Sequence, residues 1–75
     1  MTAAGGTSAE DRLVRLVHDL RTPLTVITGF SDLLERQVEK LTPEQKADYQ
    51  RRIRSAAHEM VDILDRERDE RLSSG

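Results

Sequence analysis

The sequence predicts an all-α protein, an antiparallel two-helix hairpin that pairs with a second copy as a homodimeric four-helix bundle. Apolar residues recur with a seven-residue period in two segments, and the pair Thr42-Pro43 separates these segments. The chain has only 75 residues, of which 36% are hydrophobic and 35% charged. A single core in so short a chain seldom contributes more than about 3–5 kcal/mol to stability. We therefore expect a second chain to cover part of the apolar surface.

Composition excludes several classes of protein. The chain has no cysteine, so disulfide scaffolds and cysteine–zinc sites are excluded. Its apolar runs are too short for a membrane span or a signal peptide, and its polar faces are not dominated by Lys and Arg, so we expect no direct membrane contact. A formal net charge of −2 argues against nucleic-acid binding.

The first element is a helix over about 8–39, after a disordered lead-in over 1–7. Thr7 and Glu10 have the spacing of a capping box at its start. Pro23 lies inside this helix, where a proline removes one backbone hydrogen bond and clashes with the preceding turn. It can break the segment into two helices or bend one continuous helix. The seven-residue phase continues from Leu20 to Ile27, so we favour a single helix kinked at Pro23.

A turn over about 40–42 and a second helix over about 43–72 complete the domain, which spans 8–72 and leaves a tail at 73–75. Thr42 is a good N-cap, Pro43 suits the first helical position, and Gln45 completes a second capping box. Each helix of about thirty residues is roughly 45 Å long at 1.5 Å per residue. The predicted dimer core consists of the apolar heptad positions Leu13, Leu20, Ile27, Phe30, Leu34, Ile53, Ala56, Met60 and Ile63.

His18 is the candidate functional residue. It lies on the helix face opposite the heptad seam, and Thr22, Thr25 and Gly29 follow on the same face at four, seven and eleven residues. A solvated helix usually carries Lys and Glu there, whereas short side chains allow another protein surface to come close. The alternative is that His18 is an incidental surface histidine. His58, on the second helix, lacks such neighbours and is interpreted as a surface residue.

The segment from His18 to Leu24 reads HDLRTPL and resembles the H-box of sensor histidine kinases, which has the pattern H-E/D-x-R-T/N-P-L. The flanking apolar residues and the hairpin length also resemble the dimerisation and histidine phosphotransfer domain of that family. The resemblance extends over residues 8–72. It implies a cytoplasmic phosphoacceptor domain in two-component signal transduction, whose parent kinase can be membrane-anchored.

The resemblance also implies roles for individual residues. The Nε2 atom of His18 would attack the γ-phosphate of ATP, with Asp19 as its acid/base partner. Thr22 would position a water in members with phosphatase activity, and Pro23 would bend the helix. Thr25 and Gly29 would lie on the face that contacts the receiver domain of a response regulator.

The chain contains no phosphate-binding motif of the type G-x-x-x-x-G-K-S/T. We therefore expect it to hold no cofactor and no metal, and to depend on a separate catalytic domain that binds ATP and Mg²⁺. The expected partners are a second copy of the chain, this kinase domain and a receiver domain. Two alternatives remain open, a degenerate dimerisation scaffold that is never phosphorylated and a plain coiled-coil hairpin.

Overall fold

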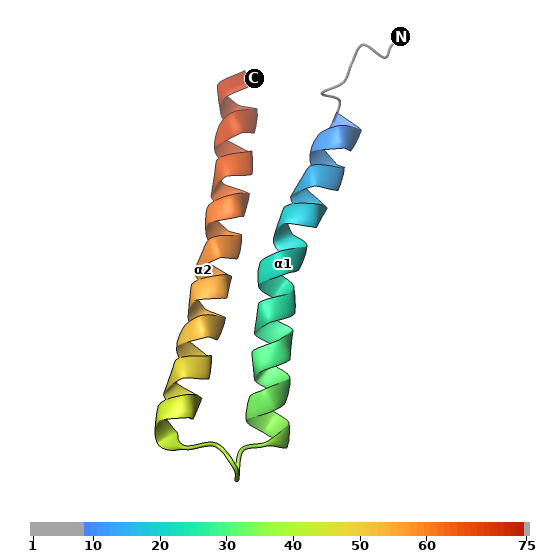
Figure 1. Cartoon of the computed structure of the whole chain (residues 1–75). Coiled ribbons are helices and arrows are strands. Elements are labelled where there is room, and N and C mark those ends of the chain that lie inside the picture. Colours follow the sequence, from blue (N-terminus) through green and yellow to red (C-terminus); the bar gives the residue numbers. More distant parts are fainter. Residues whose placement is uncertain (1–8, 75) are drawn as a thin grey trace.

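The chain forms two long helices in an antiparallel hairpin (Figure 1). The computed structural model describes the backbone of residues 9–74 and the side chains of residues 9–72. Helix α1 spans Ala9–Arg36 and helix α2 spans Pro43–Ser74, and the two helices are in contact. The extents of 57 × 21 × 11 Å correspond to a layer one helix thick. The all-α hairpin predicted from the heptads is confirmed.

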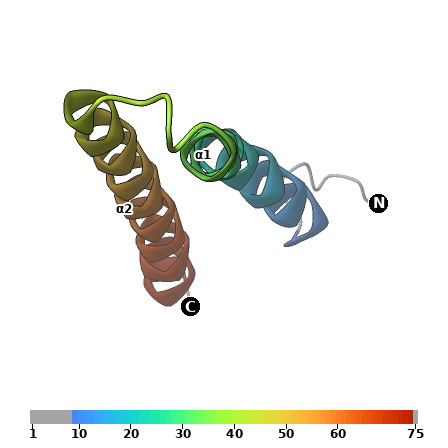
Figure 2. The same ribbon diagram turned by 90° about the horizontal axis from the view of Figure 1, so that it is seen from below.

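Helix α1 continues through its internal proline, as predicted. Pro23 lies within the 28 residues of α1, so the segment is not divided into two helices. Figures 1 and 2 both show α1 changing direction between its cyan and green parts, the region that contains Pro23. Proline has no N–H, so the carbonyl of Asp19 loses the donor that a regular helix supplies four residues later. The bend therefore follows directly from the sequence and lies next to His18.

Two predicted boundaries differ from the structure, the ends of α1 and of α2. Helix α1 ends at Arg36 rather than near residue 39, and α2 extends through Ser74, so residues 73 and 74 belong to the helix rather than to a tail. The Gln37 amide donates to the Leu33 carbonyl over 2.9 Å, and the Gln37 carbonyl then accepts the amides of Lys40 at 2.9 Å and Leu41 at 3.2 Å, which forms the turn. Gln37 occupies a seam position with a polar, exposed side chain, so no packing holds the helix beyond it. In α2, neither Gly nor Pro interrupts the backbone before residue 75. The predicted lead-in over 1–7, the Thr7 cap and Gly75 lie outside the described residues.

The capping box at the start of α2 is confirmed. The Gln45 amide donates to Thr42 Oγ1 over 3.1 Å, and the Thr42 amide donates to Gln45 Oε1 over 2.9 Å. Pro43 is the first residue of the helix, where its missing N–H has no consequence. These bonds fix the point at which the chain enters α2.

Replacing Thr42 by alanine should therefore destabilise the hairpin by about 1 kcal/mol, because one amide at the helix start loses its acceptor. The measurement is the shift of the midpoint of urea unfolding. Thr28 is an exposed threonine in α1 whose hydroxyl donates to the Thr25 carbonyl over 3.1 Å. Thr28→Ala is the control and should change the stability by less than about 0.5 kcal/mol. Equal effects of the two substitutions would contradict the capping argument.

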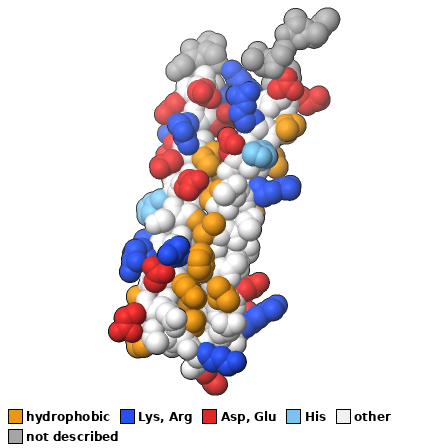
Figure 3. Space-filling view, viewed as in Figure 1, with side chains coloured by type: hydrophobic (Ala, Val, Ile, Leu, Met, Phe, Trp, Pro, Cys, Tyr) orange, Lys and Arg blue, Asp and Glu red, His pale blue; other side chains and the backbone are white. Residues whose placement is uncertain are grey.

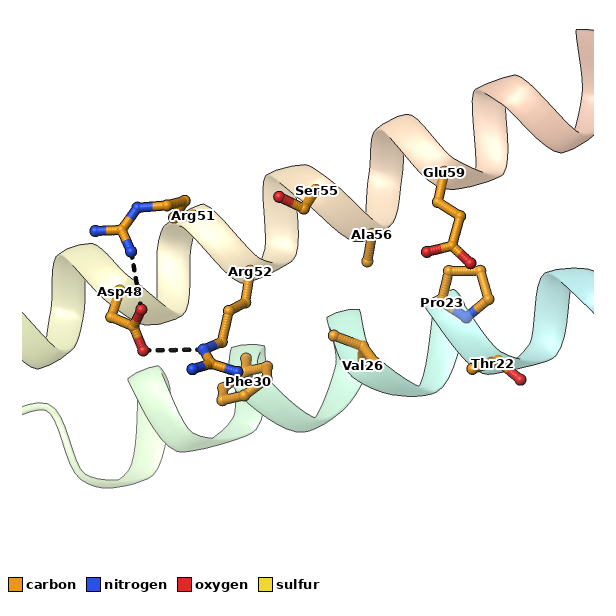
Figure 4. A pocket seen from close by; sticks show the side chains of 10 residues that line it. All are labelled: Thr22, Pro23, Val26, Phe30, Asp48, Arg51, Arg52, Ser55, Ala56 and Glu59. Carbon is orange, nitrogen blue, oxygen red and sulfur yellow. Dashed lines mark hydrogen bonds and ion pairs between the residues drawn. The ribbon is translucent and has the colours of Figure 1, made fainter.

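The seam between the helices is narrow. Among the side chains of residues 9–72, only Pro23 and Ala56 are buried, and both line the contact between α1 and α2 (Figure 4). Hydrophobic side chains are concentrated along the line between the helices (Figure 3). Most of the predicted core positions are half-buried in this seam: Leu20, Ile27, Phe30, Leu34, Ile53, Met60 and Ile63. Leu13, in contrast, is 59% exposed within the single chain.

Aromatic packing joins the helices near the turn. The rings of Phe30 and Tyr49 have centroids 4.9 Å apart and are tilted by 45°, which is a favourable geometry for an aromatic pair. The guanidinium carbon of Arg52 lies 5.6 Å from the centroid of the Phe30 ring, within the range of a cation–π contact. This end of the hairpin is therefore held by more than aliphatic contacts.

A second set of apolar side chains remains exposed on one side of the seam. We call it the outer apolar stripe, and it consists of Leu13, Val17 and Leu24 of α1 with Val61 and Leu64 of α2. Each of these side chains is about half exposed in the single chain, from 46% for Leu64 to 59% for Leu13. At 100° per residue, Leu24 lies on one side of Pro23 and Thr22 on the other. The stripe therefore faces away from the side of the seam that carries Thr22.

Candidate functional site

The site is built around His18, in the part of α1 that precedes the bend. Its side chain is 83% exposed, so the imidazole is open to approach by another molecule. In the space-filling view, a pale-blue histidine side chain protrudes from each helix (Figure 3). The prediction that His18 stands outside the seam agrees with this exposure.

Asp19 lies beside this imidazole. Its Oδ1 atom is 3.5 Å from Nδ1 of His18, and its side chain is 49% exposed. This distance is slightly longer than an ordinary hydrogen bond, so a small rotation brings the two groups into bonding range. A carboxylate on the Nδ1 side favours the tautomer with its proton on Nδ1 and its lone pair on Nε2. The Asp19 carboxylate thus lies next to the Nδ1 atom of the ring.

The strip of short side chains beyond His18 is present and open. Thr22, Thr25 and Gly29 are all exposed on α1. A Cβ atom built on Gly29 would have no neighbour within 4 Å outside the local helix backbone, so the glycine is not required by packing within the chain. A shallow depression of about 220 Å³ lies along Thr25, Val26, Gly29, Phe30 and Leu33. This part of α1 therefore presents a smooth surface to a partner.

A larger open groove of about 440 Å³ lies between the helices on the same side of the seam (Figure 4). Pro23, Val26, Phe30 and Ala56 provide its apolar surface. Polar and charged residues border it, namely Thr22 from α1 and Asp48, Arg51, Arg52, Ser55 and Glu59 from α2. We call it the interhelical groove. It begins next to the H-box and extends toward the turn.

Charges are arranged in order along this groove. Asp48 binds two arginines, with its Oδ1 atom 2.9 Å from Nη1 of Arg51 and its Oδ2 atom 2.9 Å from Nε of Arg52 (Figure 4). Glu59 lies at the other end, with its carboxylate next to the Pro23 ring in Figure 4, and it forms no ion pair among the described residues. The groove thus has a positive end near the turn and a negative end near His18.

Sequence reasoning found the line of residues on α1 but missed the groove. The pair between Asp48 and Arg52 joins residues one turn apart on α2 and is a local ion pair of that helix. The contact of Arg52 with Phe30 was not predicted. The sequence does contain a signal for the aromatic contact near the turn. Phe30 and Tyr49 both occupy seam positions close to the turn, so an antiparallel hairpin places them opposite each other.

Other kinds of site find no support in the described residues. Within residues 9–74, no three His, Asp or Glu side chains lie close enough together to hold a metal ion. Neither described helix combines the length and the apolar character that crossing a bilayer requires. The chemistry available on the groove side of the hairpin is therefore that of an exposed imidazole, a neighbouring carboxylate and a charged, partly apolar groove.

A helical hairpin that exposes an imidazole beside a carboxylate, above a surface suited to a protein partner, has the features of a phosphoacceptor domain. Comparison with protein families agrees, since residues 11–73 match the His Kinase A (phospho-acceptor) domain. The match extends over most of the chain, and the chain belongs to this family of phosphoacceptor and dimerisation domains of sensor histidine kinases. Comparison with curated proteins and with solved structures gave no match.

Proposed function

We propose that His18 accepts the γ-phosphoryl group of ATP from a separate catalytic domain and passes it to an aspartate of a response-regulator receiver. The observation that carries this proposal is the exposed imidazole of His18, with its Nδ1 atom 3.5 Å from the Asp19 carboxylate, in a chain of the phosphoacceptor family. His58 is exposed as well, but no carboxylate forms an ion pair with it among the described residues.

The chemistry follows from the two ring nitrogens. The lone pair of Nε2 forms a bond to the γ-phosphorus while the bond from that phosphorus to the bridging oxygen breaks, and ADP leaves with the electron pair. The phosphorylated ring then carries a positive charge. Asp19 stabilises this charge and accepts the Nδ1 proton, or relays it to water. In the second step a receiver carboxylate oxygen attacks the phosphorus, the N–P bond breaks, and its electrons return to Nε2.

Other residues of the outer face have supporting roles in this proposal. Thr22 lies one turn after His18 and is exposed, so its hydroxyl can orient a water against a phosphorylated receiver. Thr25 and Gly29 provide the smooth surface on which the receiver rests. Pro23 provides the bend, which lets the two halves of α1 change their relative direction at a site where one backbone hydrogen bond is already missing.

The proposal includes a homodimer. Only two side chains among residues 9–72 are buried in the single chain, and the outer apolar stripe leaves large hydrophobic side chains exposed. A second hairpin packed on this stripe completes a four-helix core, and a two-fold axis is the common way to achieve this. Leu13, exposed in the single chain, then becomes a core residue.

Partners supply what the chain lacks for this reaction. The separate catalytic domain holds ATP and Mg²⁺, since phosphoryl transfer needs groups that bind the triphosphate and the metal. ATP and receiver domains are found in the cytoplasm, so we place this domain on the cytoplasmic side of the cell. The chain itself provides the nucleophile and the docking surface.

The experiment that tests the proposal is incubation of the chain with a histidine kinase catalytic domain and ATP labelled at the γ-phosphate. We expect label that is stable in base and lost in acid, as for an N-phosphorylated histidine. Addition of a receiver domain should then move the label from the chain to the receiver. A dimeric chain that no catalytic domain labels would instead support an unphosphorylated scaffold.

A bulky side chain at Gly29 should slow the transfer of the phosphoryl group to the receiver but leave the phosphorylation of His18 unchanged. Gly29→Leu adds bulk where the chain itself has open space, so the fold and the labelling of His18 should be unchanged. Transfer to the receiver should slow by roughly ten-fold, which corresponds to about 1.4 kcal/mol of lost contact. Thr28→Leu, at the neighbouring exposed position of α1, is the matched control and should transfer at the normal rate. A normal rate of transfer by Gly29→Leu would contradict the proposal that Gly29 lies on the face that contacts the receiver.

A further inference from the structure

The two exposed histidines of the chain differ in the charges one turn away. Residues three and four apart are neighbours on a helix surface, so these positions surround each imidazole. Around His18 they hold Arg15 and Arg21, with uncharged residues at the other two positions. Around His58 they hold one arginine and one aspartate, whose charges cancel. An acidic residue follows each histidine in the sequence, so the neighbours of His18 carry a net positive charge and those of His58 a net negative one.

The two arginines beside His18 are free to bind another group. Arg15 and Arg21 are both exposed, and neither side chain forms an ion pair or a hydrogen bond among the described residues. At 100° per residue they lie 60° to either side of His18 on α1. Helical side chains lean toward the N-terminus, so the ring of His18 leans toward the turn that contains Arg15, and Arg21 leans back toward the ring. Their guanidinium groups can therefore approach a group on the ring from two sides, and no existing contact has to break.

Helix α2 supplies little positive charge at this level of the hairpin. The cavities lined by both helices show that residues 59–67 of α2 run alongside residues 16–23 of α1. The ionisable residues in this part of α2 are four acids and one arginine, namely Glu59, Asp62, Asp65, Arg66 and Glu67. The Nε atom of Arg66 donates to the carbonyl of Asp62 over 3.5 Å, within its own helix. Positive charge for an anion on His18 therefore has to come from α1.

We propose that Arg15 binds the phosphoryl group that His18 accepts, and that Arg21 binds it from the other side. This inference rests on the proposed phosphorylation of His18 and adds a residue outside the H-box to the site. A phosphoryl group carries close to two negative charges and three acceptor oxygens, which a planar guanidinium binds with paired N–H groups. Asp19 and the acids of α2 repel these charges, and the two arginines offset the repulsion.

Phosphoramidate tests the inference without a catalytic domain or ATP. The lone pair of Nε2 attacks the phosphorus of this reagent, the P–N bond of the reagent breaks, ammonia leaves with the electron pair, and the Nδ1 proton is released to water. The variants His58→Gln and His18→Gln each retain one histidine, so each carries the group at a single known place. The pKa of the attached phosphoryl group is measured from its ³¹P chemical shift. A guanidinium beside the group favours the dianion, so we expect the lower pKa on His18.

Substitution of the arginines then assigns the difference. In the His58→Gln background, Arg15→Gln and Arg21→Gln should each raise the pKa of the phosphoryl group on His18 by about 0.3 of a unit, as for partly exposed charge pairs. Arg15→Lys keeps the charge and should retain most of the effect. Arg36→Gln is the matched control, because it removes the same charge in the last turn of α1, about 27 Å from His18 at 1.5 Å per residue. It should leave this pKa unchanged.

Three results would overturn the inference. They are equal pKa values for the two phosphohistidines, an effect of Arg15→Gln no larger than that of Arg36→Gln, and failure of the reagent to modify His18 while it modifies His58. Circular dichroism should show unchanged helix content in every variant. The proposed function is judged separately, by labelling with ATP. Failure of that labelling in the unaltered chain, together with the expected pKa shifts, would count against transfer from a catalytic domain and not against the arginine site.

Discussion

Replacement of His18 by glutamine will reduce the incorporation of label from ATP to the background of an unphosphorylated protein. Glutamine keeps a polar side chain of similar reach but has no ring nitrogen that can form the N–P bond. His18 is 83% exposed, so the substitution should change the free energy of unfolding by less than about 0.5 kcal/mol. The loss should exceed about a thousand-fold, because it removes the nucleophile rather than a group that assists it. The measurement is retention of label after base treatment, with circular dichroism to confirm the helices.

His58 supplies the matched control for this prediction. It is the second exposed histidine of the chain, on α2, and His58→Gln should accept label at the normal rate. Label that persists in His18→Gln would refute the site. Loss of label only in His58→Gln would show that His58, on α2, is the phosphoacceptor.

Introduction of a glutamate at Leu24 will convert the chain from a dimer to a monomer. Leu24 is 48% exposed in the single chain and belongs to the outer apolar stripe, so a charge there does not enter the hairpin's own seam. In the dimer the same charge would be buried without a partner, which costs several kcal/mol. Sedimentation equilibrium should give twice the chain mass for the unaltered protein and a single chain mass for Leu24→Glu. Leu20→Asp and Ile27→Asp should have a broader effect, because both residues are also half-buried between α1 and α2.

Val14 provides a control of the same chemistry. It is 67% exposed on α1, but lies one turn before His18 on the outer face rather than on the stripe. Val14→Glu should therefore remain dimeric. A folded monomer for the unaltered chain, or dissociation by Val14→Glu but not by Leu24→Glu, would contradict the proposed dimer face.

The hairpin could be predicted because its signals are local and repeated. Leu20 and Ile27 keep the heptad phase across Pro23, which distinguishes a bend from a break, and α1 is indeed continuous. Thr42 and Gln45 are three residues apart, and the capping box they form needs no contact from elsewhere in the chain. The end of α1 was predicted wrongly, because the heptad count passed over Gln37 although its polar side chain cannot hold the seam together.

The helix face that carries the site could also be predicted, but the interhelical groove beside it could not. Helical spacing alone places His18, Thr22, Thr25 and Gly29 on one exposed face. The interhelical groove depends instead on how closely two helices approach at Pro23 and Ala56, and on the rotamer that places Arg52 over Phe30. A seven-residue repeat contains no information on such contacts between distant segments. For the same reason, periodicity does not say which of the predicted core residues pack between α1 and α2 and which are left for contact with a second chain.

Location of the phosphoryl group by mass spectrometry tests the central claim most directly. The two histidines are separable, because cleavage after Arg15 and Arg21 releases residues 16–21 with His18, whereas cleavage after Arg54 and Arg66 releases residues 55–66 with His58. The chain is labelled by a catalytic domain and ATP, digested at neutral pH or above, and analysed without acid. We expect the added phosphoryl mass on the peptide 16–21 and none on the peptide 55–66. A phosphoryl group on residues 55–66, or on a serine or threonine instead of histidine, would contradict the account.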